Sequence, residues 1–201
     1  MASSAPLVVV SGFGPFEVFD RNPSGEVALA LGARPPSGLR VRSGVLPVSF
    51  RRAPEVFDEL LVSGEPPALC LALGVAPDPG FRLERFAGSA LRLVPRPDVD
   101  GRTAREFSRE GALLESSVDL AGPLAALRAR GVGDAWISLR AGGYVCEHVY
   151  HHVLARAVRL GVPGLFVHVP PLRFTAIERQ VEVIGWLLEE LLPQVSSSRR
   201  G

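Results

Sequence analysis

The sequence predicts a three-layer α/β/α sandwich with a largely parallel central sheet. Apolar segments rich in β-branched residues or leucine alternate along the chain with segments in which apolar residues have helical spacing. Such alternation is typical of α/β domains. Several apolar segments are too continuous to bury one face only, which indicates a sheet covered by helices on both sides.

The strands and helices follow from these patterns in order. The apolar runs predict strands at 7–11, 39–48, 68–75, 135–139 and 165–169. Helical spacing predicts helices at 23–33, 50–64, 120–131, 145–161 and 174–192. Gly131 and Gly161 end two of these helices, as glycine commonly does. We interpret the remaining stretch, 84–118, as a hairpin or an extended excursion from the sheet.

Length and composition limit the classes of protein to consider. The 201 residues fit one domain, which we place at 1–193, with the polar residues 194–201 as a disordered tail. The net charge of +1 offers no electrostatic case for binding nucleic acid or an anionic membrane. The N-terminus lacks a basic region and a long apolar run, so we expect neither a signal peptide nor a membrane anchor. A cytoplasmic protein is therefore expected.

Cys146 is the first candidate for chemistry. It follows the strand at 135–139 through Gly142 and Gly143 and lies in the first turn of the next helix. Free backbone N–H groups and the helix dipole at that position favour a thiolate, so sulfur could act as a nucleophile. The alternative is a small apolar residue that closes a helix–sheet contact. Cys70 lies inside an apolar run, and we expect both thiols to be free.

A nucleophilic cysteine needs a base and usually an acid that orients the base. His168 is the candidate base because it ends a buried strand, whereas three other histidines lie on the Cys146 helix and point elsewhere: His148, His151 and His152. Glu84 is the candidate orienting acid, although a local ion pair with Arg85 is the alternative. The histidine spacing lacks a HExxH motif, so no metal site is expected.

The first loop, SGFGPFEVFDRNPS at 11–24, predicts a binding pocket. It carries three aromatic side chains, Phe13, Phe16 and Phe19, which suit a rigid apolar pocket or, alternatively, a loop packed under the sheet edge. Asn22 is the only asparagine of the chain, which suggests that this position requires a short amide. The chain has no GxGxxG motif and no P-loop lysine, so no nucleotide cofactor is expected.

Six ordered motifs together resemble the pyroglutamyl-peptidase I family of cysteine peptidases, also called pyrrolidone-carboxylate peptidases. They are SGFGPFEVFDRNPS at 11–24, LPVSF at 46–50, LERFA at 83–87, PDVDG at 97–101, AGGYVCEHVYHHVL at 141–154 and FVHVPPL at 166–172. The resemblance implies a mixed-sheet α/β/α fold, no cofactor, a homotetramer, and removal of N-terminal pyroglutamate from peptides through a thioester. It also implies Cys146 as nucleophile, His168 as general acid/base and Glu84 as the orienting acid.

The resemblance implies further roles around the nucleophile. Residues that match the family's pocket positions are Phe13, Phe16, Asn22, Tyr144 and Val145. The oxyanion would be held by backbone N–H groups from Tyr144 to Cys146, together with Arg85, while His168 as imidazolium stabilises the Cys146 thiolate.

The chain departs from the family's usual motifs at Gly88, Ser89, Val99, Arg140 and Glu147, at Gly143 where the family usually has threonine, and in the loop GVAPDPG at 74–80, which lacks the family's polar Gln/Gly-rich sequence. These changes put substrate contacts and efficiency in question more than fold or nucleophile. Two alternatives to an active pyroglutamyl peptidase therefore stay open. One is a cysteine amidase with altered acyl specificity, and the other is a non-catalytic protein that binds blocked peptide N-termini.

Overall fold

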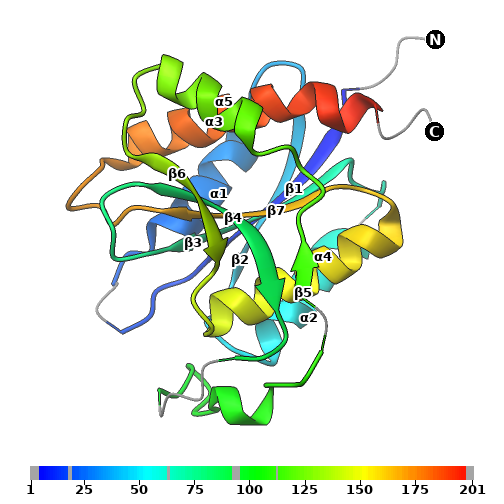
Figure 1. Ribbon diagram of the computed structural model, residues 1–201, viewed down its shortest axis with the longest axis vertical. Coiled ribbons are helices and arrows are strands. Elements are labelled where there is room, and N and C mark those ends of the chain that lie inside the picture. The colour runs from blue at the N-terminus through cyan, green and yellow to red at the C-terminus, as the bar shows by residue number, and fades with distance from the viewer. Residues whose placement is uncertain (1–4, 18–19, 63, 92–95, 112, 198–201) are drawn as a thin grey trace.

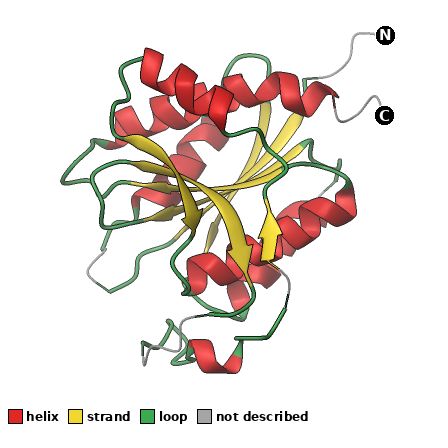
Figure 2. Ribbon diagram, viewed as in Figure 1, coloured by secondary structure: helices red, strands yellow, loops and turns green. Residues whose placement is uncertain are grey.

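A mixed sheet between two layers of helices forms the structure, a computed structural model (Figures 1 and 2). It describes residues 5–17, 20–62, 64–91, 96–111 and 113–197. The strands are β1 (Leu7–Phe13), β2 (Arg40–Leu46), β3 (Leu69–Val75), β4 (Phe81–Gly88), β5 (Leu113–Glu115), β6 (Ala135–Arg140) and β7 (Gly164–Val169). The helices are α1 (Pro23–Ala33), α2 (Arg52–Val62), η1 (Ala104–Glu106), α3 (Ala121–Ala129), α4 (Val145–Leu160) and α5 (Ile177–Ser197).

The sheet is largely parallel, with β4 and β6 reversed. Its order is β2-β1-β3-β7-β4-β5, and β6 pairs with β4 on the edge opposite to β5, since Phe86 pairs with residues of both strands. The first four strands are mutually parallel, whereas β4 is antiparallel to β7 and parallel to β6. The predicted fold class, a three-layer α/β/α sandwich with a mixed, largely parallel sheet, is confirmed.

Each face of the sheet has its own apolar core. Helices α1, α3 and α5 cover one face, where Leu31, Leu127 and Leu187 pack against alternate side chains of the central strands. Helices α2 and α4 cover the other face, where Phe57 and Tyr150 contribute to a second cluster. Both faces of β1, β3 and β7 are therefore buried, which explains why these strands have continuous apolar sequences.

Strand β4 differs from the sequence prediction. The sequence predicted no strand of the sheet between 75 and 135, but residues from Phe81 onward form a strand that pairs with β7 on one edge and with β6 on the other. The charged residues Arg82, Glu84 and Arg85 interrupt its apolar pattern and concealed it. The interruption includes Arg82 and Glu84 on the face of the strand that carries the candidate site, where Glu84 is fully buried.

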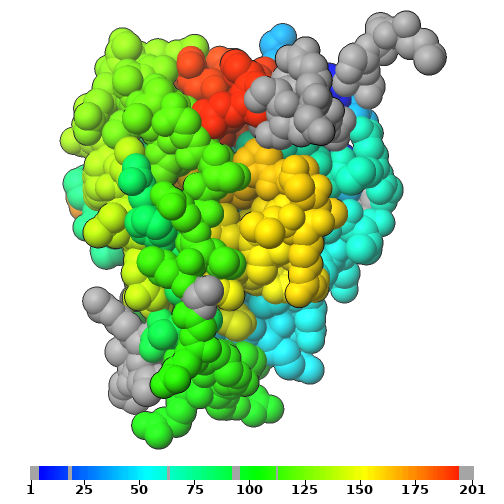
Figure 3. Space-filling model, turned by 45° about the vertical axis from the view of Figure 1, so that its right-hand side comes forward, coloured from blue at the N-terminus to red at the C-terminus, as the bar shows by residue number. Residues whose placement is uncertain are grey.

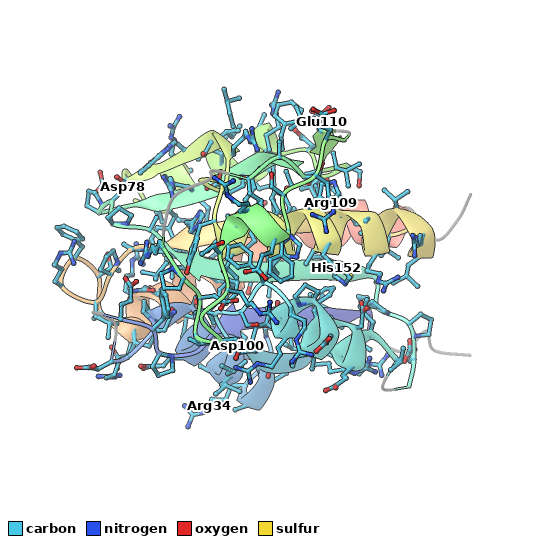
Figure 4. The ribbon with its side chains drawn as sticks, turned by 90° about the horizontal axis from the view of Figure 1, so that it is seen from below. Arg34, Asp78, Asp100, Arg109, Glu110 and His152 are labelled. Atoms are coloured by element: carbon cyan, nitrogen blue, oxygen red, sulfur yellow. The ribbon has the colours of Figure 1, made fainter. Side chains whose placement is uncertain are left out.

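The excursion predicted at 84–118 is present in part. The end of β4 pairs with β5 as an antiparallel ladder, and residues 89–112 connect the two strands. The described part of this connection lies at the lower edge of the molecule beside α2 and α4 (Figure 3), and Figure 4 shows it from below with Asp100 and Arg109 labelled. Asp100 attaches it to the start of α2 by accepting hydrogen bonds from Ser49 Oγ at 2.6 Å and Arg52 Nε at 2.9 Å.

The C-terminal helix is longer than predicted. It continues to Ser197, so residues 194–197 of the expected tail are helical, and residues 198–201 lie outside the described ranges. None of the helices described is both long and apolar enough to cross a membrane.

Candidate active site

Cys146 lies at the start of α4, as the sequence predicts. A turn containing Gly142 and Gly143, with φ of 99° and 81°, connects β6 to the helix. Both values lie in the left-handed region that favours glycine. Tyr144 has extended backbone at the N-cap, and α4 begins at Val145. The nucleophile candidate is therefore the second helical residue, where the backbone N–H groups lack intrahelical acceptors.

His168 and Glu84 form a buried pair on neighbouring strands. The His168 Nδ1 atom lies 2.7 Å from Glu84 Oε1, and both side chains are almost completely buried. An Nδ1–H that donates to the carboxylate leaves Nε2 as the basic nitrogen. Gly74, the partner of His168 on β3, provides the space, because a Cβ at Gly74 would lie 3.1 Å from the His168 ring.

Arg82 is a charged neighbour of this pair that sequence reasoning missed. It lies opposite His168 in the β4–β7 ladder, so both side chains leave the same face of the sheet. Its Nε atom is 3.5 Å from Glu84 Oε1, and its Nη1 atom is 3.0 Å from Asp78. A cation thus borders the buried carboxylate.

Burial keeps the Cys146 thiol protonated in the unliganded site. It is the largest influence and raises the pKa of Cys146 to about 12, and the Glu84 carboxylate raises it further. The guanidinium groups of Arg82 and Arg96 and the backbone N–H of Cys146 act in the opposite direction. The helix terminus is therefore outweighed by desolvation, contrary to the sequence expectation of a resting thiolate.

His168 is also neutral in the resting site. Burial lowers its pKa below the ordinary value, and the hydrogen bond and charge of Glu84 only partly oppose that effect. With the pKa of Cys146 raised and that of His168 lowered, the uncharged pair is favoured over the expected thiolate–imidazolium pair. Proton transfer must then accompany nucleophilic attack.

A cavity of about 370 Å³ opens beside Cys146. Its described lining combines apolar and aromatic groups with two arginines: Phe13, Phe16, Asn22, Val48, Val75, Pro77, Arg96, Tyr144, Cys146 and Arg173. Asn22 supports the first loop, because its Nδ2 donates to Gly14 O at 2.9 Å and its Oδ1 accepts from Ser24 N at the start of α1. Four predicted pocket residues, Phe13, Phe16, Asn22 and Tyr144, therefore meet at one cavity with Cys146.

Arg96 is the second residue that sequence reasoning missed. Its guanidinium lies 5.4 Å from the Phe16 ring centre and 5.0 Å from that of Tyr144, and it is paired with Glu17. Tyr144 Oη donates to Pro97 O at 2.7 Å, which attaches the same segment to the N-cap of α4. The position of Arg96 directly before the PDVDG motif was the available signal.

Two predicted site residues are placed elsewhere. Val145 is fully buried in the core between α4 and the sheet and is not among the described residues that line the cavity. Arg85 follows Glu84 in β4, so strand alternation directs its side chain to the opposite face from the Glu84–His168 pair. That placement contradicts Arg85 as an oxyanion ligand.

The other histidines of α4 have packing contacts. The His148 ring lies 5.8 Å from Phe50 and 5.6 Å from Phe107 between ring centres. Its burial lowers its pKa to about 4. His152 Nε2 is 2.8 Å from Asp58 Oδ1. The described part of the chain contains no group of three or more side chains suited to hold a metal ion.

Comparison with known sequences identifies the relatives of this chain. The family model for pyroglutamyl peptidase matches residues 7–190. A pyrrolidone-carboxylate peptidase of Deinococcus radiodurans is 35% identical over 173 residues, which cover 82% of this chain and 78% of that protein. A pyrrolidone-carboxylate peptidase of Ralstonia nicotianae is 32% identical over 179 residues with the same two coverages.

Solved structures agree with the sequence match. The pyrrolidone carboxyl peptidase of Thermus thermophilus superposes with a TM-score of 0.80 at 31% identity, covering 92% of this chain and 100% of that one. A mutant of the Pyrococcus furiosus enzyme reaches a TM-score of 0.85 at 26% identity, covering 94% and 99%. The chain therefore belongs to the pyroglutamyl peptidase family, cysteine peptidases that remove N-terminal pyroglutamate from peptides.

Proposed function

We propose that Cys146 is the nucleophile of this pyroglutamyl peptidase, with His168 as general acid/base and Glu84 as the residue that orients it. The observation that carries this assignment is the buried 2.7 Å contact between His168 Nδ1 and Glu84 Oε1. Both groups lie on the α4 face of the sheet, and Glu84 acts electrostatically on the Cys146 thiol. A base held by a carboxylate near a thiol at a cavity is the arrangement that acyl transfer requires.

The uncharged resting pair determines the first step. His168 Nε2 accepts the thiol proton while Cys146 Sγ attacks the pyroglutamyl carbonyl, so charge separation develops in the transition state. Glu84 stabilises the imidazolium as it forms, and His168 then gives the proton to the departing amine. Water, activated by His168, hydrolyses the thioester, releasing pyroglutamate and restoring the thiol.

The oxyanion is stabilised by the start of α4 and by positive charge at the cavity. The free N–H groups of its first turn, that of Cys146 among them, form a donor site for developing negative charge. Arg96 replaces Arg85 in this proposal, because its guanidinium lines the cavity and acts on the Cys146 thiol.

The cavity suits a small, uncharged acyl group. Pyroglutamate is a neutral lactam without a free α-amine, and the aromatic side chains of Phe13, Phe16 and Tyr144 form a compact wall for it. No carboxylate is among the described lining residues. A substrate with a free ammonium group would lose its hydration in this cavity without gaining an anionic partner.

The test of the proposal is hydrolysis of a fluorogenic pyroglutamyl amide. Cys146→Ala should abolish turnover, and iodoacetamide should inactivate the wild-type enzyme. Cys70→Ala is the matched control, because Cys70 is a fully buried core thiol on β3. Equal loss in both variants, or no hydrolysis by folded wild-type protein, contradicts the proposal.

The two alternative functions predict other outcomes. A cysteine amidase of altered specificity would prefer another acyl group in a panel of N-blocked and aminoacyl amides. A non-catalytic binder would show calorimetric binding of pyroglutamyl peptides without any hydrolysis.

Assembly and compartment are separate proposals. Family resemblance supports a homotetramer. Light scattering of the purified protein gives its molar mass in solution and tests this proposal. The need for a reduced Cys146 thiol supports a reducing compartment such as the cytoplasm. Detecting the protein in separated cell fractions tests that location.

A further inference from the structure

We infer that Gly88, Arg140 and Glu147 act as one positioning unit that holds the start of α4, and with it Cys146, against β4. The inference rests on the proposed role of Cys146 as nucleophile. The three residues come from the end of β4, the end of β6 and the first turn of α4, so the unit joins three elements at one point.

Glu147 is the centre of this unit. Its side chain is completely buried although it directly follows the nucleophile candidate. The Oε1 atom accepts a hydrogen bond from Gly88 N at 2.7 Å and another from Arg140 Nε at 2.9 Å. Arg140 also donates from Nη2 to Ala90 O at 3.1 Å. One carboxylate oxygen therefore connects α4 directly to the backbone of β4.

Glycine at position 88 leaves room for the Arg140 guanidinium. A Cβ there would lie 2.5 Å from Arg140 Nη2 and 3.1 Å from its Cζ, so any larger residue would displace the guanidinium. Displacement would leave the buried Glu147 carboxylate without its cation. The small residue, the arginine and the carboxylate are thus mutually dependent.

The unit supplies one attachment between the described residues of α4 and β4. A second is Tyr150 Oη, which donates to Glu84 O at 2.7 Å from the next turn of the helix. Cys146 directly precedes Glu147, which makes the first attachment, and the backbone carbonyl of Glu84 accepts the hydrogen bond of the second. The two attachments together set the position of Cys146 relative to the Glu84–His168 pair.

The charges of this unit are poorly explained by stability alone. A buried ion pair seldom stabilises a fold more than apolar residues of similar volume would. Glu147 Oε2 is moreover buried without a hydrogen-bond partner among the described residues, which is unfavourable for a carboxylate. The carboxylate provides a hydrogen-bond acceptor for the Gly88 N–H, which an apolar side chain would not.

The unit also accounts for three of the departures from the family motifs. Gly88, Arg140 and Glu147 are far apart in sequence, yet they contact one another and satisfy each other's steric and electrostatic requirements. Changes that compensate in this way indicate a maintained nucleophile position.

Two double variants separate positioning from folding. Arg140→Met with Glu147→Gln removes both charges but keeps an amide oxygen for the Gly88 N–H. Arg140→Met with Glu147→Leu removes the same charges and the acceptor as well. Thermal unfolding, kcat and KM for a fluorogenic pyroglutamyl amide are measured for both, well below the unfolding temperature.

The Gln variant should keep kcat within about threefold of wild type, whereas the Leu variant should lose about 10- to 100-fold in kcat with little change in KM. Equal kcat values in the two folded variants overturn the inference. Should the Leu variant not fold, Gly88→Ala provides the same test, and wild-type kcat in that variant overturns it. Failure of the proposed function is distinguishable, because wild-type enzyme would then show no turnover dependent on Cys146.

Discussion

Replacing Glu84 with glutamine tests the proposed base most directly. The substitution preserves shape on β4 but removes the charge 2.7 Å from His168 Nδ1. We expect kcat to fall, because the developing imidazolium loses its buried counter-charge and the amide no longer selects the tautomer with a basic Nε2.

The magnitude follows from the kind of contact that is lost. A hydrogen bond to a charged group contributes about 1.5–3 kcal/mol. Since each 1.4 kcal/mol corresponds to about a tenfold change in rate, kcat should fall about 10- to 150-fold. The loss appears in kcat more than in KM, because the imidazolium exists only as the reaction proceeds.

The assay is steady-state hydrolysis of a pyroglutamyl amide, with circular dichroism to verify the fold. Glu182→Gln is the matched control, since Glu182 forms an exposed ion pair with Arg179 on α5. A folded Glu84→Gln enzyme with kcat within twofold of wild type would refute the role assigned to Glu84.

Three further predictions concern protonation and space at the site. Because His168 must be neutral to accept the thiol proton and burial lowers its pKa, kcat/KM should rise with pH through an acid limb below about 6.5; an acid limb above pH 7.5 would contradict this assignment. Arg96 lowers the pKa of Cys146, so Arg96→Met should raise that pKa. Alkylation of Cys146 by iodoacetamide at pH 8 should then be about 2- to 5-fold slower, and Arg179→Met is the control. Gly74→Ala would place a Cβ 2.7 Å from the Phe166 ring and 3.1 Å from the His168 ring, so it should displace both rings, lower kcat and cost about 1–3 kcal/mol in the free energy of unfolding measured by urea denaturation; unchanged activity would show that the His168 ring has room.

Most of the fold was accessible from apolar periodicity, because the helices and the buried parallel strands have unambiguous patterns. Strand β4 was missed, since it carries Arg82, Glu84 and Arg85 within eight residues. The buried Glu84 carboxylate in this strand is stabilised by a partner that lies far away in sequence, His168. Local pattern therefore fails where the strand serves the site.

The residue types of the candidate site could be predicted from the sequence, but the geometry of the site could not. Cys146, His168 and Glu84 were chosen by residue type and position relative to strand ends. Arg96 was missed because its approach to the cavity depends on the connection between β4 and β5, which has no periodic pattern. The resting thiolate was wrongly expected because a helix terminus is visible in sequence, whereas the degree of burial is not.

Two further departures from the family motifs, at Ser89 and Val99, also favour an active enzyme over a non-catalytic binder. Val99 contributes its backbone N–H to Val48 O at 3.1 Å, a contact that does not depend on its side chain. Ser89 Oγ donates to Arg109 O at 3.2 Å within the same excursion. Neither residue is among the described residues that line the cavity with Cys146. A chain that had lost catalysis would be free to change its buried Glu84–His168 pair first, since an unused buried carboxylate costs stability. The pair persists while Ser89 and Val99 lie outside the cavity, so selection for turnover is the simplest physical account.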